Sequence, residues 1–432
     1  MLALPLDGTE DVFVWKTWSY GALDQGVTRL YGVGGSPPER GIVRWGDRFT
    51  TVDYPPIALY ELAVTGAIYR AFVPSFANTR WLNVAMKLPS FIAEIGLAVL
   101  LWRLIRRRFG ETPATWTLIA FWANPAMILA GPVLGYLDPL MALPAVAAIA
   151  CATVGWSFAA GALFAIACLT KAQAVFIAPV VALAVWNCAS GRRIASAVMS
   201  AAGAATVSAF TLAPFALVGA WRNVVQGVGS LLRHDMLSAD AANLWWVVTY
   251  VMRAAYATHD LGAWAAWTMT VRILGISRVI ALGYANPRPW ATAAVVAAAA
   301  WALWRVRQSR ALPVMLACAA FVVHAYFVLG VQVHENHLYL AVPLLAAAAA
   351  IHRQLRPVFY GASAVFALNL FLFFGIGRGF PLPSRNFTVI DATVLVAAAN
   401  CVLLLIHARR LVAIVVTTGS SRNHHRPAAS YP

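Results

Sequence analysis

Charged residues are scarce in this chain of 432 residues: they make up 11% of it, whereas apolar residues make up 61%. Soluble globular domains carry about a quarter charged residues and are about half apolar. No polar stretch is long enough to form a sizeable soluble domain. These shortages exclude a soluble enzyme and predict an all-α integral membrane protein.

Cysteines are also few, and all five lie in apolar runs without CxxC or CxxH spacing. They are predicted to be small core residues that form neither disulfides nor metal sites. The chain has no Walker loop, dinucleotide fingerprint or nucleophile elbow. No metal, cofactor or soluble nucleotide donor is therefore expected. The cysteines are Cys151, Cys168, Cys188, Cys318 and Cys401.

Acidic residues number 16 against 32 basic ones, which gives a formal charge of +16. The basic residues form short clusters between apolar runs, which is typical of cytoplasmic loops and not of a nucleic-acid surface. No nucleic-acid partner is predicted. The clusters lie at 103–108, 192–193, 305–310, 353–356 and 409–410, so the connections 132–138, 171–173, 219–240, 331–337 and 376–387 are predicted to share the opposite face.

Apolar runs recur along most of the chain, and a membrane-spanning helix needs about 20 such residues. They predict a polytopic bundle of about 12–14 transmembrane helices. The predicted spans are 81–102, 113–131, 139–154, 156–170, 174–190, 194–218, 241–256, 261–283, 289–304, 312–330, 338–351, 357–375 and 388–407.

The first 80 residues differ from the rest. The apolar stretch 57–73 contains Glu61 and Arg70 and is predicted to lie at the membrane interface, while 7–50 includes an amphipathic helical pattern. We expect a non-cytoplasmic first loop with interfacial helices at 1–80, from which an upstream membrane helix is missing. A multi-pass domain at 81–410 and a cytoplasmic tail at 411–432, disordered at its end, are expected to follow.

The stretch "DYPP" places Asp53 and Tyr54 before two prolines. Prolines suit the first turn of a helix, and a preceding aspartate can cap it. A fixed, poorly solvated carboxylate could equally serve as a general base. Local chemistry leaves the helix cap and the base as equal alternatives.

The stretch "QVHENH" places Gln332, His334, Glu335 and His337 within six positions at the end of a predicted span. Ionisable residues are costly there and usually face a cavity. The HExxH zinc motif is absent from this stretch. We predict a site in which His334 hydrogen-bonds a phosphate and Glu335 orients the histidine or pairs with a cation.

Three polar residues mark two further connections of the same face. Asp138 before Pro139 is either the N-cap of the next helix or part of the site. Lys171 either snorkels or binds an anionic headgroup or phosphate, and Gln173 follows it. Asn124, before Pro125, is interpreted as a repair of a helix kink.

Aromatic and basic residues complete the candidates. Asn243, Trp245 and Trp246 are either interfacial anchors or the wall of a sugar or lipid groove. The remaining basic residues of this face contact either phosphate or lipid headgroups, and they are Arg233, His234, Arg378 and Arg385.

Five motifs in order, "DYPP" at 53–56, "NP" at 124–125, "LTKAQ" at 169–173, "AANLWW" at 241–246 and "QVHE" at 332–335, resemble one family. This is the dolichyl-phosphate-glucose-dependent glucosyltransferases of asparagine-linked glycan assembly and their bacterial relatives, polytopic glycosyltransferases of the GT-C type. The resemblance extends from about residue 11 to 350. This sequence departs from the family's pattern in two ways. Asn336 stands where the family has a lysine, and the family's membrane helix before the first outer loop is missing.

The resemblance implies transfer of a hexose, glucose or mannose, from a polyprenyl-phosphate donor to a glycan or lipid-linked acceptor, with inversion, outside the cytoplasm. It implies that Asp53 is the catalytic base, that His334 lies near the donor phosphate with Glu335 in support, and that no metal is needed. Lys171 and the outer arginines are expected to assist with the phosphate. A multi-pass protein of a bacterial-type plasma membrane is expected. The alternative function is a transporter or flippase of a lipid-linked or polar substrate.

Overall fold

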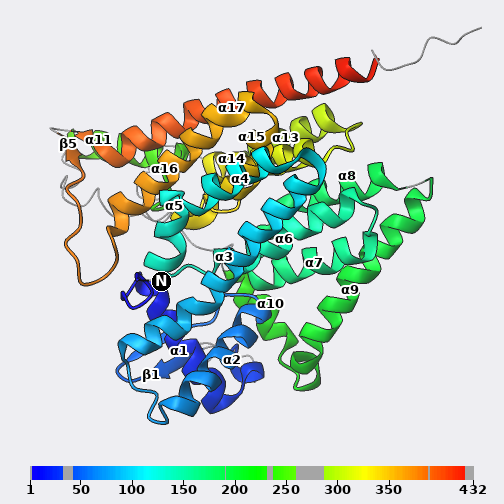
Figure 1. Ribbon diagram of the computed structural model, residues 1–432. Coiled ribbons are helices and arrows are strands. Elements are labelled where there is room, and N and C mark those ends of the chain that lie inside the picture. The colour runs from blue at the N-terminus through cyan, green and yellow to red at the C-terminus, as the bar shows by residue number, and fades with distance from the viewer. Residues whose placement is uncertain are drawn as a thin grey trace, which may run out of the picture.

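The computed structural model describes residues 2–32, 42–189, 191–230, 237–258, 287–387 and 390–423, and these are mostly helical (Figure 1). The strands are two or four residues long; β1 pairs with β2 and β5 with β6 as neighbours in the chain, whereas β3 at 238–239 pairs in parallel with the distant β4 at 333–334. The α-helices are α1 Glu10–Gln25, α2 Pro56–Phe72, α3 Arg80–Phe109, α4 Glu111–Trp122, α5 Pro125–Ile128, α6 Asp138–Thr153, α7 Ser157–Thr170, α8 Ala178–Cys188, α9 Arg193–Leu217, α10 Trp221–Ser230, α11 Leu244–Thr258, α13 Arg288–Val306, α14 Leu312–Leu329, α15 Ala341–Ile351, α16 Arg356–Phe374 and α17 Ala392–Asn423. The short elements are η1 Val27–Arg29, η2 Leu129–Val133, η3 Ala172–Ile177, η6 Glu335–Leu338, η7 Arg353–Leu355, β1 Ile42–Trp45, β2 Arg48–Thr51, β3 Ser238–Ala239, β4 Val333–His334, β5 Asn386–Phe387 and β6 Ile390–Asp391.

Several helices are long and apolar enough to cross a membrane. Within the described ranges there are five, or six if the bent pair of α4 with α5 and η2 is one span. The all-α, multi-pass membrane class is thus confirmed. The described parts of the predicted spans fall largely on helices, although the span 388–407 includes the strand β6. Helices α6, α7, α8 and α15 are shorter than a full span, so the total of about 12–14 stays a prediction. The span 261–283 lies outside the described residues.

The last helix differs from its prediction in length. α17 continues to Asn423, whereas the sequence predicted a span ending at 407 and a tail from 411. The basic pair at 409–410 lies inside this helix and does not end it, because arginine has a high helix propensity. The predicted disorder of the tail falls on residues outside the described ranges.

The bend between α4 and α5 is a local consequence of sequence. Pro125 cannot continue the hydrogen-bond ladder of α4, and the two helical segments are bent by 44°. Asn124 caps the new helix by accepting a hydrogen bond from the backbone N–H of Ala126 at 3.0 Å, and its amide donates to Ser363 Oγ at 2.8 Å. The interpretation of Asn124 as a repair of a kink is confirmed.

The N-terminal elements form a unit of their own. Figure 1 shows α1, α2 and β1 together at one end of the bundle, and α2 packs against both α1 and α3. Trp15, Trp18 and Leu59 are buried in the shared core. The opposite face of α2 exposes Val64 and Phe72, which suits the interfacial position predicted for this stretch.

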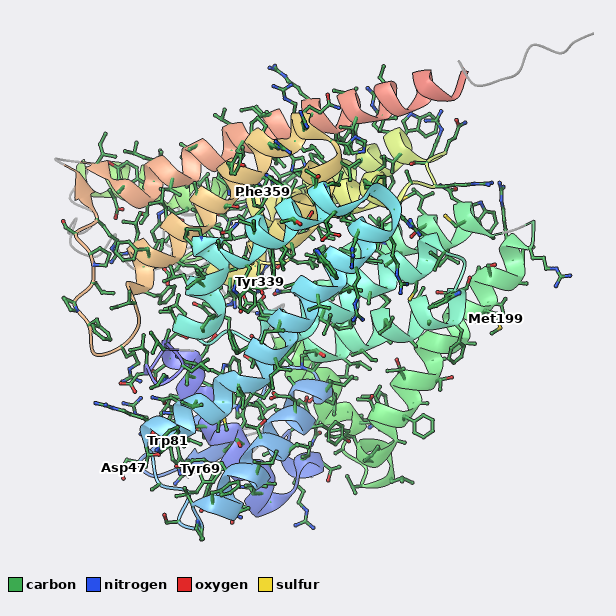
Figure 2. All side chains as sticks on the ribbon, viewed as in Figure 1. Asp47, Tyr69, Trp81, Met199, Tyr339 and Phe359 are labelled. Carbon is green, nitrogen blue, oxygen red and sulfur yellow. The ribbon has the colours of Figure 1, made fainter. Side chains whose placement is uncertain are left out.

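Helix α9 approaches α7 closely because two glycines lie at the crossing. A Cβ on Gly161 would lie 1.8 Å from the carbonyl oxygen of Ser200, and one on Gly203 would lie 2.1 Å from that of Phe158. No larger residue fits at either position. The outer face of α9 carries exposed apolar side chains such as Met199, labelled in Figure 2, and suits contact with lipid.

Buried polar residues tie the last helix to the bundle. The Asn400 amide on α17 donates to the carbonyl of Ala242 at 2.9 Å, so its Oδ1 faces His324 Nε2, also at 2.9 Å, as an acceptor. Because His324 Nε2–H donates to Asn400, the Nδ1 atom of a neutral His324 is an acceptor. It accepts a hydrogen bond from Nδ1–H of His407, 3.2 Å away. This network fixes α17 against α14 and holds the "AANLWW" segment.

Candidate functional site

A cavity of about 1560 Å³ lies beside the N-terminal unit. Its wall is formed by α1, the loop before α2, the junction of α7 with η3, one face of α9, α10, α13 and the turn between α14 and η6. Segments that are more than 100 residues apart in the sequence therefore meet around one space. The predicted site residues that line it are Asp53, Tyr54, Lys171, Gln173, Gln332, His334, Glu335 and His337.

Asp138 is the centre of a buried polar cluster behind this wall. Its carboxylate accepts hydrogen bonds from Lys171 Nζ at 2.7 Å, Gln173 Nε2 at 2.7 Å and Asn336 Nδ2 at 3.2 Å. Asp138 is fully buried and Lys171 is 4% exposed, so the lysine does not snorkel. The alternative of Asp138 as an N-cap is wrong, because Leu137 is the N-cap and the carboxylate points toward Lys171.

A second cluster surrounds the "QVHENH" turn. Tyr136 donates to Glu335 Oε1 at 2.7 Å, and His334 Nδ1 lies 3.8 Å from Glu335 Oε2. His337 Nδ1 lies 2.9 Å from the hydroxyl of Tyr326. The turn begins at Gln332, whose positive φ of 62° reverses the chain direction. His334, with its side chain 37% exposed, is the more accessible of the two histidines.

Asp53 faces the cavity from the loop before α2. It does not cap this helix: Pro55 is the N-cap, Pro56 the first helical residue, and no side chain caps the helix. Burial, with a smaller contribution from the charge of Asp11, raises the pKa of Asp53 to about 6. Of the two alternatives for "DYPP", the helix cap is wrong.

Asp11 is a second carboxylate in the cavity wall, and sequence reasoning missed it. It lies in the first turn of α1, and burial raises its pKa to about 6, partly offset by the charge of Lys171. Asp138 and Glu10 raise this pKa slightly. The amphipathic pattern of "EDVFVWKTW" places Asp11 in the first turn of a helix. Acidic residues are common there because they interact favourably with the helix dipole, so the pattern did not indicate a functional role.

Aromatic rings form the wall next to these carboxylates. Trp15, Trp18 and Tyr54 lie with their ring centroids 4.9 to 5.6 Å apart. The Tyr54 ring also faces Lys171 Nζ at 5.7 Å. The indole N–H of Trp15 donates to the carbonyl of Gly135 at 3.1 Å. This hydrogen bond holds the aromatic wall against the turn before α6.

The other half of the cavity is apolar. A single face of α9 contributes small residues and Leu212, and α13 contributes Val295 and Val296. The Phe176 ring closes the space near η3. The cavity therefore combines a polar end with an apolar groove.

Arg288 is a further cavity residue that sequence reasoning missed. It begins α13 and lines the cavity. The predicted assignment of connections to the two membrane faces could have indicated Arg288. This residue stands at the start of the predicted span 289–304, on the same face as "QVHENH". Within the described ranges, no three His, Cys, Asp or Glu residues converge as a metal site.

Four predicted candidates have other partners in the structure. Asn243 caps α11 by accepting from the Trp246 N–H at 2.9 Å, and Trp245 Nε1 donates to the Leu329 carbonyl at 2.8 Å. Arg378 pairs at the surface with Glu10 at 2.5 Å, and Arg385 lies over the Phe373 ring. These contacts support positioning or surface roles instead of substrate binding. Arg233 and His234 lie outside the described residues.

Fold and site together define a polytopic all-α membrane protein with a half-polar, half-apolar cavity beside its N-terminal unit. No family model matches the chain, and no curated protein does. Among solved structures it is similar to the oligosaccharyltransferase of Archaeoglobus fulgidus, crystallised with a tethered acceptor peptide, with a TM-score of 0.39 and 13% identity. The match covers 94% of this chain and 51% of the other, so the chain spans about half the length of that protein.

Proposed function

We propose that this protein is an integral membrane glycosyltransferase that moves a hexose from a polyprenyl-phosphate donor to an acceptor hydroxyl on the non-cytoplasmic face. One observation carries the proposal: Asp11, Asp53 and His334, from three distant segments, line one cavity that also has an apolar groove. Positioned groups of this kind supply the orientation that a transfer reaction needs.

The groove offers a place for the prenyl chain of the donor. The face of α9 with Leu212 and the face of α13 with Val295 would contact the chain, which places the phosphate near the polar end. Lys171, His334 and Arg288 are the cationic or hydrogen-bonding groups at the cavity wall. We expect Lys171, His334 and Arg288 to supply hydrogen bonds and positive charge to the phosphate.

The chemistry is a single displacement. The acceptor oxygen forms a bond to the anomeric carbon while the bond from that carbon to the phosphate oxygen breaks, and the phosphate leaves with the electron pair. A carboxylate takes the acceptor proton. The leaving phosphate needs hydrogen-bond donors and cations, not an acid.

Two carboxylates are candidates for the base. The resemblance of "DYPP" favours Asp53, whereas the charge of Lys171, which lowers the pKa of Asp11, favours Asp11. We therefore expect Asp11 to act near the phosphate end, where the reacting carbon must lie. We propose Asp11 as base, with Asp53 as a second carboxylate of the cavity whose pKa the charge of Asp11 raises.

Reconstitution tests the function. The purified chain in lipid nanodiscs is mixed with polyprenyl-phosphate glucose or mannose and a panel of alkyl hexosides. Transfer of the labelled hexose to an acceptor hydroxyl, with inversion, supports the proposal. Lack of any glycosidic product with both donors and a lipid-linked oligosaccharide acceptor would overturn it.

Transfer should depend on pH in a definite direction. The base must be ionised, and the pKa of each carboxylate is raised to about 6, so kcat/KM is expected to fall about tenfold per unit below about pH 6 and to level off above about 7. Since these folded pKa values exceed the unfolded ones, ionisation costs stability, and thermal stability should fall as pH rises between about 4 and 6. An activity profile with no acid limb in this window would contradict the role of the pair.

A further inference from the structure

Two amide side chains in the cavity wall each have an unpaired oxygen. Gln173 Oε1 and Asn336 Oδ1 are buried and have no hydrogen-bond partner, although both residues line the cavity. Leaving a buried acceptor unpaired costs about 1–3 kcal/mol, so native proteins rarely do so without a reason. Neither oxygen is used in the transfer chemistry described above.

The orientation of both amides follows from Asp138. An ionised carboxylate only accepts hydrogen bonds, so each amide must turn its NH2 group toward it. Gln173 Nε2 lies 2.7 Å from Asp138 Oδ1, and Asn336 Nδ2 lies 3.2 Å from Asp138 Oδ2. Rotating either amide by 180° would set oxygen against oxygen. The two amide oxygens are therefore held as acceptors directed away from Asp138.

A pair of fixed acceptors selects the chemistry of its ligand. Phosphate oxygens also accept hydrogen bonds and would be repelled, so the ligand must bring O–H or N–H donors. A cationic amine is disfavoured because Lys171 already matches the charge of Asp138 at 2.7 Å. Neutral donors therefore match the pair best, and in the proposed function these are the hydroxyl groups of a hexose.

We infer that Gln173 and Asn336, oriented by Asp138, form a subsite that binds two hydroxyl groups of a hexose. The inference deepens the proposed function, on which its assignment to the donor hexose rests. Lys171 shares Asp138 with both amides, so the subsite adjoins the cationic groups expected to hold the donor phosphate. The site thereby separates sugar recognition from phosphate binding.

Binding of small sugars tests the subsite without requiring transfer. The full chain in nanodiscs is titrated with methyl glucoside, methyl mannoside and their monodeoxy analogues, followed by ligand-observed NMR. A site built to bind a hydroxyl rejects the analogue that lacks it. We expect that removing either of two hydroxyls weakens binding by about 10- to 100-fold.

Variants assign each hydroxyl to its amide. In Gln173→Met the penalty for one deoxy position should disappear, and in Asn336→Leu the penalty for the other, because the acceptor that bound that hydroxyl is gone. Gln25→Met, an exposed residue at the end of α1, should keep both penalties.

Equal binding of all deoxy analogues to the wild-type protein, or penalties unchanged in both amide variants, would overturn the subsite. The proposed function can fail independently: deoxy penalties that follow the amides, combined with no transfer from any polyprenyl-phosphate hexose, would retain the subsite and reject the enzyme. Transfer whose rate does not change when any sugar hydroxyl is removed would retain the enzyme and reject the subsite.

Discussion

Asp11→Asn is expected to reduce hexose transfer by about 10²- to 10⁴-fold, the usual contribution of a general base, while the protein stays folded and binds donor. Asparagine keeps the size of the side chain but cannot take a proton at neutral pH. Asp11 lines the cavity, and its raised pKa of about 6 suits a base that must be ionised near pH 7. Initial rates with a labelled polyprenyl-phosphate hexose measure the loss.

Two variants make this result specific. Glu10→Gln changes the neighbouring carboxylate, which pairs with Arg48 and Arg378 at the surface, and should leave transfer unchanged. Asp53→Asn should cost less than Asp11→Asn, because Asp53 is not the group that takes the acceptor proton. Full loss in Asp53→Asn with near-normal rates in Asp11→Asn would exchange the two roles.

Asp138→Leu is expected to destabilise the fold by about 3–5 kcal/mol, because it leaves the Lys171 ammonium buried without its partner. The pair is almost inaccessible to solvent, with side-chain exposures of 6% for Lys171 and 0% for Asp138. Gln173 and Asn336 would also lose the acceptor that orients them. The unfolding midpoint in detergent, followed by tryptophan fluorescence, measures the effect.

The double variant Asp138→Leu with Lys171→Met separates charge from packing. It should be more stable than Asp138→Leu alone, since the unpaired buried charge is removed as well. Arg106→Met breaks an exposed pair with Glu111 and should cost no more than about 1 kcal/mol. If the double variant were as unstable as Asp138→Leu, the buried ion pair would not be the cause.

The helices and the grouping of the site residues could be predicted from the sequence. Apolar runs predict helices, because backbone groups in lipid must form their hydrogen bonds within the helix. The basic clusters predicted which connections share a membrane face, and that prediction grouped Asp138, Lys171 and His334 on one side. In the structure these residues lie around one cavity or directly behind its wall.

Contacts between segments that are distant in the sequence could not be predicted. An aspartate before a proline fits an N-cap and a buried ion pair equally well, and only the position of Lys171 decides between them for Asp138. Arg378 appeared free to bind phosphate until α1 placed Glu10 beside it. Asp11 resembled an ordinary first-turn acid because its environment is supplied by η3 and η6, far away in the sequence.

Sealed proteoliposomes give the most direct test of the central claim, because they separate catalysis from lipid transport. The wild-type chain is reconstituted with polyprenyl-phosphate glucose or mannose carrying a labelled sugar, and alkyl hexosides are supplied on one side. We expect the label in a new glycoside of inverted anomeric configuration, and almost none with Asp11→Asn. Movement of labelled lipid across the bilayer with its sugar–phosphate bond intact, and without any new glycoside, would contradict the enzyme and indicate a flippase.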